Sequence, residues 1–167
     1  MTVTIVPIEM RHVEGLNECV AEVARERRYL SIVEGFTLDQ SAGWVAANRL
    51  RANPFLVALD LDRVVGWCEV RRDILPGRAH TGMVGMGLLA AYRGLGLGRQ
   101  LIDQALRAAR ERGFERLELS VRSPNERAIR LYQKVGFREE GRKRDAVRLD
   151  GVSEDEVLMA LHLREHG

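Results

Sequence analysis

The segment Ala91–Arg99 (AYRGLGLGR) constrains the fold of this chain most strongly. The apolar run 83–90 precedes it, and an amphipathic helix pattern follows it. A strand, a glycine turn and a helix start direct several backbone N–H groups, and the positive end of a helix dipole, towards one point. Glycines suit such a turn because a Cβ would block close approach and disfavour positive φ. The segment therefore predicts a phosphate-binding turn, to which Arg93 and Arg99 add positive charge.

Two common phosphate-binding patterns do not fit these glycines. The nucleoside-triphosphate loop G-x-x-x-x-G-K-[ST] needs a lysine and a hydroxyl residue after its last glycine, and neither follows here. The dinucleotide fingerprint G-x-G-x-x-G would place Arg99 or Leu101 where its third glycine belongs, although Glu115 or Glu118 could serve as its ribose-binding acid. A tight turn without any ligand is the remaining alternative.

The glycines fit a third pattern, R-x-x-G-x-G, over residues 93–98. A later segment, 125–137, reads N-x-x-A-x-x-x-Y-x-x-x-G-F, with Asn125, Ala128 and Tyr132 at its defined positions. In this order the two motifs resemble the pyrophosphate loop and the second CoA-binding segment of the GNAT superfamily of acetyl-CoA-dependent N-acetyltransferases. The resemblance extends from Thr4 to Leu163.

This resemblance implies acetyl-CoA as co-substrate and no metal ion. Backbone N–H groups of residues 95–99 would bind the pyrophosphate, and the Asn125 amide would bind the pantetheine or the pyrophosphate. A backbone N–H near Leu88 or Leu89 would stabilise the oxyanion, and one such donor is worth about 3 kcal/mol of barrier. The predicted cofactor-binding residues are Leu88, Leu89, Arg93, Gly94, Leu95, Gly96, Leu97, Gly98, Arg99, Asn125, Ala128 and Tyr132.

The resemblance also implies direct attack of an amine on the thioester, without an acyl-enzyme. Tyr132 is the candidate general acid for the thiolate; it follows Asn125 by about two helical turns, so both side chains face one side. Its alternative is a core tyrosine on an apolar helix stripe. Glu69, near the expected amine, and His80, whose residue type is the usual general base at neutral pH, are candidate general bases. Glu69 could instead form an ion pair, and His80 could instead be a surface or structural residue. In that case a chain of water molecules would serve as the base.

Composition predicts a single globular domain over residues 1–167. A formal net charge of +2 excludes the strong basic excess of a general nucleic-acid binder. Cys19 and Cys68 are isolated, and the histidines have no metal-ligand spacing, so neither a disulfide framework nor a metal site is expected. No apolar run reaches the ~18 residues of a membrane span, and the start resembles no secretory signal. A cytoplasmic protein is expected.

Hydrophobic periodicity predicts the element order βααβββαβαββ. Helices are expected over 9–29, from an N-cap at Thr37 to Asn53-Pro54, over 97–112, and from a capping box at Ser123. Strands are expected over 2–8, 55–59, 64–71, 79–89, 116–121, 137–149 and 152–163. This is the order of the GNAT fold, an α/β fold with a mixed, twisted sheet of about seven strands that splays after the fourth strand at the acetyl-CoA site.

Two local features are also expected. The second helix should direct Leu38, Ala42, Val45 and Leu50 inward, because they share one helical face. The glycines at 82, 85 and 87 indicate a bulge, or a close approach of another backbone or of a ligand, in the fourth strand.

The amine acceptor is less defined. In the GNAT fold, the loop between the first two helices and the last hairpin shape its site. Here the loop 29–36 is largely apolar with one acid, Glu34, which suits a small primary amine with a hydrophobic part, although core packing would explain it equally. The ending Asp150-Gly151…Asp155-x-x-x-Met159 resembles the branch with phosphinothricin, amino-acid and ribosomal-protein N-acetyltransferases.

The expected function is acetyl transfer to a primary amine of a small molecule, such as a free amino acid or a xenobiotic amine. A protein N-terminal or lysine acetyltransferase is an alternative, but no acidic run indicates a peptide groove. The presence of Tyr132 disfavours a non-catalytic acyl-CoA-binding module. The spacing of the glycines disfavours a dinucleotide-dependent enzyme. Analogy with the family predicts a homodimer through the closing strands, with no nucleic-acid or membrane partner.

Overall fold

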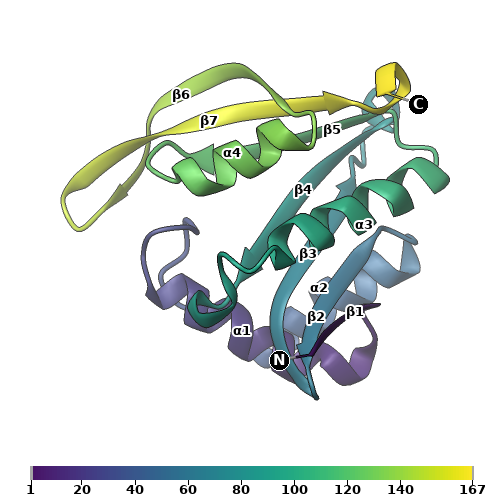
Figure 1. The fold of residues 1–167 in the computed structure, drawn as a ribbon, viewed down its shortest axis with the longest axis vertical. Helices are drawn as coiled ribbons and strands as arrows, with labels where there is room; N and C mark the ends of the chain where they lie inside the picture. The colour runs from purple at the N-terminus through teal and green to yellow at the C-terminus, as the bar shows by residue number, and fades with distance from the viewer. Residues whose placement is uncertain (1, 167) are drawn as a thin grey trace.

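A single seven-stranded sheet organises the computed structural model, which describes residues 2–166 (Figure 1). Met1 and Gly167 of the expected domain lie outside the described residues. The strand order is β1-β2-β3-β4-β5-β7-β6. The strands are β1 (Val3–Pro7), β2 (Phe55–Asp60), β3 (Arg63–Arg72), β4 (Thr81–Leu88), β5 (Arg116–Arg122), β6 (Arg138–Leu149) and β7 (Val152–His162). The α/β class and the expected order of elements are confirmed.

The sheet opens between β4 and β5. These two strands run parallel, whereas every other neighbouring pair is antiparallel. Their pairing joins Thr81–Met83 to Arg116–Glu118, and in the described part of the chain no further pair follows. β4 continues to Leu88 and diverges from β5, as Figure 1 shows. The splay after the fourth strand is therefore confirmed.

Two helices cover each face of the sheet. Helices α1 (Val13–Arg25) and α2 (Leu38–Leu50) lie on one face, and α3 (Leu97–Glu111) and α4 (Glu126–Lys134) lie on the near face in Figure 1. Side chains of β3 alternate between them: Glu69 contacts Trp44 of α2, whereas a Cβ at Gly66 would contact Leu101 of α3. None of the helices described in residues 2–166 has the length and apolar character needed to cross a membrane.

Helix boundaries differ from the prediction at two places. The expected helix 9–29 is a short 3-10 turn, Met10–His12, followed by α1, which ends before Arg27 because that residue has φ 59°. Helix α4 is capped by Asn125 and not by Ser123, since the Asn125 side chain accepts from the Ala128 N–H at 3.3 Å. The N-cap predicted at Thr37 is confirmed by a capping box with Gln40.

The inward face of α2 also differs from the prediction. Leu38 and Leu50 are exposed, whereas Ser41, Val45 and Asn48 are buried. Hydrogen bonds explain this, because Ser41 accepts from Asn17 and the Asn48 amide donates to the Trp44 carbonyl. A pattern based on hydrophobicity could not identify buried polar residues that are satisfied in this way.

The glycines of β4 mark the close approach of neighbouring side chains, and not the bulge or the second backbone expected from the sequence. The register between β3 and β4 is continuous from Gly66–Leu88 to Arg72–Gly82. A Cβ at Gly82 would lie 2.7 Å from atoms of both Phe114 and Val70. The absent side chain therefore lets α3 and its following turn pack directly on the sheet.

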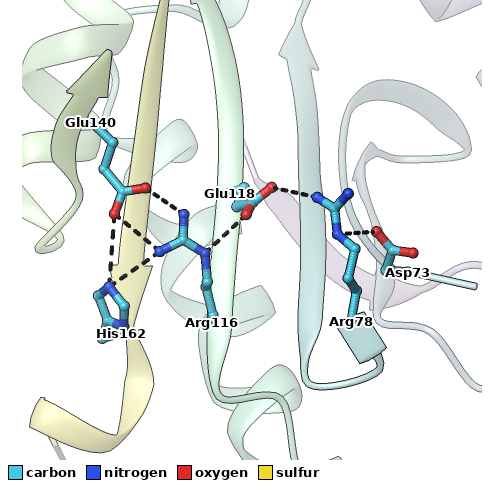
Figure 2. A network of polar contacts seen from close by, with 6 residues as sticks. All are labelled: Asp73, Arg78, Arg116, Glu118, Glu140 and His162. Carbon is cyan, nitrogen blue, oxygen red and sulfur yellow. Dashed lines mark hydrogen bonds and ion pairs between the residues drawn. The ribbon is translucent and has the colours of Figure 1, made fainter. Parts of the chain in front are cut away.

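A network of charged side chains braces the closed end of the β4–β5 junction (Figure 2). Arg78, which precedes β4, contacts Asp73 at 3.2 Å and Glu118 of β5 at 3.9 Å. Arg116 contacts Glu118 at 2.9 Å and also binds Glu140 of β6, which contacts His162 of β7. The network therefore links β5, β6 and β7 to the connection between β3 and β4, at the end where β4 and β5 are joined.

Candidate active site

A cleft of about 610 Å³ occupies the near-face side of the open end of the sheet. Its walls come from the end of β4, the start of α3, helix α4 and the connection after α1. The lining residues are Val23, Arg28, Tyr29, Met86, Gly87, Leu88, Ala90, Arg93, Gly98, Pro124, Asn125, Glu126, Arg127, Ala128, Leu131 and Tyr132. The two segments singled out in the sequence, 93–98 and 125–132, therefore meet across one cavity.

The glycine turn presents unpaired N–H groups at one wall. Gly94 and Gly96 adopt φ 77° and 82°, the left-handed conformation that glycine tolerates best. Gly96 caps α3, and the first regular helical bond is donated by the N–H of Gln100 to the Gly96 carbonyl. The N–H groups of residues 97–99 lack intrahelical acceptors and lie at the positive end of the helix dipole. This geometry is suited to an anion.

The Arg93 side chain lies in the cleft but is bound to protein groups. Its guanidinium donates to the Glu26 carboxylate at 2.8 and 2.5 Å and to the Leu88 carbonyl at 3.1 and 2.7 Å. It also stacks on the Tyr29 ring, 4.4 Å from the centroid. These contacts tie the end of α1 to the end of β4, and the contribution of the Arg93 charge to phosphate binding stays a prediction.

Two other arginines flank the glycine turn. Arg99 is paired with Asp103 one turn along α3, at 2.9 Å. Arg127 reaches the turn from α4, since a Cβ at Gly94 would lie 3.9 Å from its Nη1. Sequence reasoning missed Arg127, although a basic residue in the first turn of a helix opposes the helix dipole and so indicates another role.

The backbone of Leu88 points into the opening. The Leu89 N–H donates to the Val65 carbonyl at 2.9 Å and is therefore satisfied within the sheet. Successive peptide groups of a strand point to opposite edges, so the Leu88 N–H points away from β3. The Leu88 carbonyl points the same way, because it accepts from Arg93. Of the two donors considered in the sequence, Leu88 is the one available in the cleft.

Tyr132 and Asn125 line the same wall of the cleft, on α4. Tyr132 is buried and packs against Phe137, with ring centroids 5.8 Å apart. Burial raises the pKa of its hydroxyl, so the group stays protonated and can donate a proton. The Asn125 oxygen caps the helix, which leaves the NH₂ of its amide as the group able to contact a ligand.

Glu69 is a buried carboxyl on the opposite face of β3 from Cys68. The Trp44 indole donates to its Oε2 at 2.7 Å, and Arg71 lies 3.3 Å from its Oε1. Burial raises the pKa of Glu69 to about 7, against the smaller lowering effects of Arg71 and of the Trp44 hydrogen bond. The carboxyl can therefore exchange a proton near neutral pH.

His80 lies away from the opening. It is exposed and precedes β4, whose eight residues span about 25 Å before the strand reaches Leu88. Its carbonyl accepts from the N–H groups of Glu115 and Arg116 at the closed end of the sheet. This distance from the opening disfavours His80 as a base. Glu69 is closer to the opening, because it pairs in register with Gly85, three residues before Leu88.

Comparison with protein families gives a match over residues 18–137 to the acetyltransferase (GNAT) family. The chain belongs to this family. Among curated GNAT relatives, it is 38% identical over 73 residues to the uncharacterized N-acetyltransferase YdgE of Bacillus subtilis, covering 44% of this chain and 46% of that protein. It is 37% identical over 70 residues to the [ribosomal protein bS18]-alanine N-acetyltransferase of Escherichia coli K12, covering 42% and 47%. The matches span about half the length of these two relatives.

Solved structures of the GNAT fold superpose over nearly the whole chain. YncA of Salmonella typhimurium, solved with its cofactor acetyl-CoA, has a TM-score of 0.92 at 23% identity, covering 100% of this chain and 97% of that one. A GNAT phosphinothricin acetyltransferase of Sinorhizobium meliloti, in complex with acetyl-CoA, has a TM-score of 0.91 at 18% identity, covering 97% and 89%. These likenesses establish the GNAT fold of this protein.

The two titratable candidates of this GNAT protein lie on opposite faces of its sheet. Tyr132 belongs to α4 on one face, whereas Glu69 faces α2 on the other. In the described residues, strand pairing between β4 and β5 ends at Met83–Glu118, so no backbone ladder joins the two strands at the open end. Among residues 2–166, no cluster of side chains is arranged to hold a metal ion.

We predict that the Glu69 carboxyl makes the stability of the fold depend on pH. Its folded-state pKa of about 7 exceeds the ordinary value of 4.5, so its favourable contribution is complete below pH 4.5 and is lost as pH rises through 7. Glu69→Gln should therefore gain about 2 kcal/mol of unfolding free energy relative to wild type between pH 5 and pH 8.5. Urea denaturation at both pH values measures this.

The exposed carboxyl of Glu34 provides the matched control. Glu34→Gln should change the unfolding free energy equally at both pH values. An equal change for Glu69→Gln at pH 5 and pH 8.5 would contradict a raised pKa for Glu69.

Proposed function

We propose that this protein transfers the acetyl group of acetyl-CoA directly to the primary amine of a small molecule, such as a free amino acid or a xenobiotic amine. The observation that carries this proposal is the convergence of an anion-binding turn, a buried tyrosine and an outward-facing Leu88 peptide group in one cleft. A carboxyl that titrates near pH 7 lies across the gap. The family match and the fold support the same reaction.

The groups in the cleft suit the parts of acetyl-CoA. The pyrophosphate is bound by the N–H groups of residues 95–99, and the Leu88 edge of β4 offers a donor to the thioester oxygen. Gly98 keeps this wall close-packed, since a Cβ there would lie 3.3 Å from Leu131 and 3.5 Å from Leu88. Asn125 and Ala128 form the facing wall.

In the proposed reaction the amine nitrogen attacks the thioester carbon from the Glu69 face. The C–N bond forms, and the resulting oxyanion accepts a hydrogen bond from the Leu88 N–H. The C–S bond then breaks. The sulfur takes the Tyr132 proton, and Glu69 takes the proton released by the amine, directly or through water. Trp44 donates to Oε2 of Glu69 at 2.7 Å, whereas Oε1 has only the longer contact with Arg71 at 3.3 Å, so Oε1 is the more available oxygen for this proton. Tyr132 regains its proton from solvent as CoA leaves.

A protein N-terminus is the second candidate acceptor. Its support is the likeness to the relative named a [ribosomal protein bS18]-alanine N-acetyltransferase, together with the uncovered face of β5 and β7, where Ser120 is exposed and Leu158 is half-buried. The small-amine proposal is preferred because the sequence contains no acidic run that would indicate a peptide groove. Leu30 and Ile32 of the loop 29–36 pack against the core, so the apolar character of this loop does not decide between the two acceptors.

The function is tested by thiol release from acetyl-CoA in the presence of amine panels. The panels contain free amino acids, polyamines, aminoglycosides, phosphinothricin-like amines and ribosomal N-terminal peptides. Turnover with one class of small amine is expected. Turnover with peptides alone would transfer the assignment to protein modification. Absence of turnover, with acetyl-CoA still raising the melting temperature, would indicate a CoA-binding protein without transferase activity.

The role of Tyr132 predicts a loss of rate without a loss of binding. Tyr132→Phe should lower kcat at least tenfold, about 1.4 kcal/mol of barrier, because the thiolate loses its proton donor. The dissociation constant of CoA should stay within twofold. Tyr92→Phe is the control, since Tyr92 is another buried tyrosine whose hydroxyl binds Asp60 outside the cleft. An unchanged kcat for Tyr132→Phe would refute the acid role.

The role of Glu69 predicts a specific change in the pH profile. With the wild-type protein, kcat/KM for the amine should fall as pH decreases through about 7, where Glu69 becomes protonated. In Glu69→Gln this inflection should disappear and the plateau rate should fall. A profile with the same inflection in both proteins would assign the base elsewhere.

Arg127 should add to the binding of the cofactor phosphates. Arg127→Ala should raise the dissociation constant of CoA about tenfold, as removal of a charge-assisted hydrogen bond does, and should weaken its dependence on salt. Arg130→Ala is the control, because Arg130 is an exposed arginine of the same helix paired with Glu126. Isothermal titration measures both, and equal affinities for the two variants would exclude a phosphate contact.

We also propose, from the family analogy, a homodimer formed through β6 and β7 and a cytoplasmic location. Light scattering coupled to size-exclusion chromatography tests the dimer, and a mass of one chain at micromolar concentration would reject it. Cell fractionation tests the location.

A further inference from the structure

Side chains, rather than backbone pairing, connect the two halves of the molecule at the open end of the sheet. Past the pair Met83–Glu118, no strand pairing joins β4 to β5 in the described residues. The connection after α1 lies at this end, over residues 26–37, and contains neither helix nor strand. In Figure 1 the tip of the β6–β7 hairpin reaches towards this connection from the other half of the sheet.

Arg122 makes the inner contact between the halves. It is the last residue of β5, and only 5% of its side chain is exposed. Its Nε donates to Glu154 at 2.6 Å, and its Nη1 donates to the carbonyls of Arg27 and Leu30 at 3.1 and 3.2 Å. One buried guanidinium therefore joins β5, β7 and the connection after α1.

Arg27 and Asp150 make the outer contact. The Arg27 guanidinium donates to both oxygens of Asp150, each at 2.9 Å. Asp150 lies in the turn of the β6–β7 hairpin, with φ 54°. Arg27 itself has φ 59°, a conformation unfavourable for a residue with a Cβ, and its carbonyl is one of those held by Arg122. The two contacts thus meet at one residue of the loop.

These contacts lie on the face of the sheet that holds Glu69. Along β5, Leu117, Leu119 and Val121 are buried towards α3 and α4, so the alternating Arg122 points to the other face. The segment held by Arg122 continues into the apolar loop 29–36, which packs beside α2. Phe36 at the end of this loop contacts the Trp44 ring, with centroids 6.0 Å apart, and Trp44 donates to Glu69. The conformation of the loop is therefore coupled to the surroundings of Glu69.

We propose that Arg122, Arg27 and Asp150 form a latch that fixes the loop 27–36 against the β6–β7 hairpin, and that Arg122 is a positioning residue for the amine acceptor. The proposal rests on the proposed transfer to a small amine. Arg28 and Tyr29 of this loop also line the cleft. Opening the latch therefore weakens the use of the amine much more than the binding of acetyl-CoA.

The test combines kinetics with hydrogen exchange. Arg122→Lys keeps the charge but cannot bind Glu154 and two carbonyls together. It should raise KM for the best amine about tenfold, the effect of losing a charge-assisted hydrogen bond, with the acetyl-CoA dissociation constant within twofold. Amide exchange of residues 28–36 should become faster by a similar factor. Equal increases in the amine KM and the acetyl-CoA dissociation constant would overturn the positioning role.

A second, milder variant keeps the proposal testable if Arg122→Lys does not fold. Asp150→Asn opens the outer contact at an exposed position, and asparagine tolerates the positive φ. It should raise the amine KM and the exchange rate of residues 28–36 roughly threefold. Asp145→Asn is the matched control, because Asp145 is another exposed hairpin aspartate with positive φ that pairs with Arg148 within the hairpin. An Asp145→Asn effect equal to that of Asp150→Asn would overturn the latch.

The exchange measurement also separates this proposal from the proposed function. If wild-type protein shows no turnover with any amine, the transfer function fails, while faster exchange in Asp150→Asn and Arg122→Lys still supports the latch. If turnover is present but exchange of residues 28–36 is the same in wild type and both variants, the latch fails alone.

Discussion

The short parallel pairing of β4 with β5 is the constraint on which the rest of this structure depends. It joins Thr81–Met83 to Arg116–Glu118, and the strands then separate. Polar backbone groups along the end of β4 are therefore left without strand partners, in a position where a ligand can reach them. The charged network shown in Figure 2 braces the joined end, and the glycine turn closes the other end of β4. The opening is thus fixed by the sheet and does not need a mobile lid.

The same separation brings together groups that the sheet would otherwise keep apart. Tyr132 and Glu69 lie on opposite faces, and burial shifts both pKa values upward. For the tyrosine this keeps a proton available for donation, and for the carboxyl it moves titration to near neutral pH. One physical effect, desolvation, therefore suits the two groups to opposite tasks. In the proposed reaction the two groups act on the same thioester across the gap between the strands.

Much of the site could be predicted from local patterns. The glycines at 94 and 96 indicated the turn because positive φ is a local property, and the Asn125–Tyr132 spacing indicated one helix face. The contacts of Arg93 could not be predicted, because its partner Glu26 is distant in sequence and is brought near only by the packing of α1. The hydrogen bond between Trp44 and Glu69 could not be predicted for the same reason, nor could the proximity of Arg127 to the glycine turn, since each joins segments that only packing brings together.

The sequence by itself determined the order of elements, the glycine turn and the two hairpins, since each depends on residues close together in the chain. It misjudged the cap of α4, where the chain turns from Arg122 to Asn125, and the inward face of α2, where buried Ser41 and Asn48 are satisfied by hydrogen bonds. The tertiary structure alone decided which strand edges stay unpaired, which arginines remain available to a ligand and which carboxyl is desolvated. These properties depend on groups distant in sequence, because burial and long-range pairing exist only after the chain has packed.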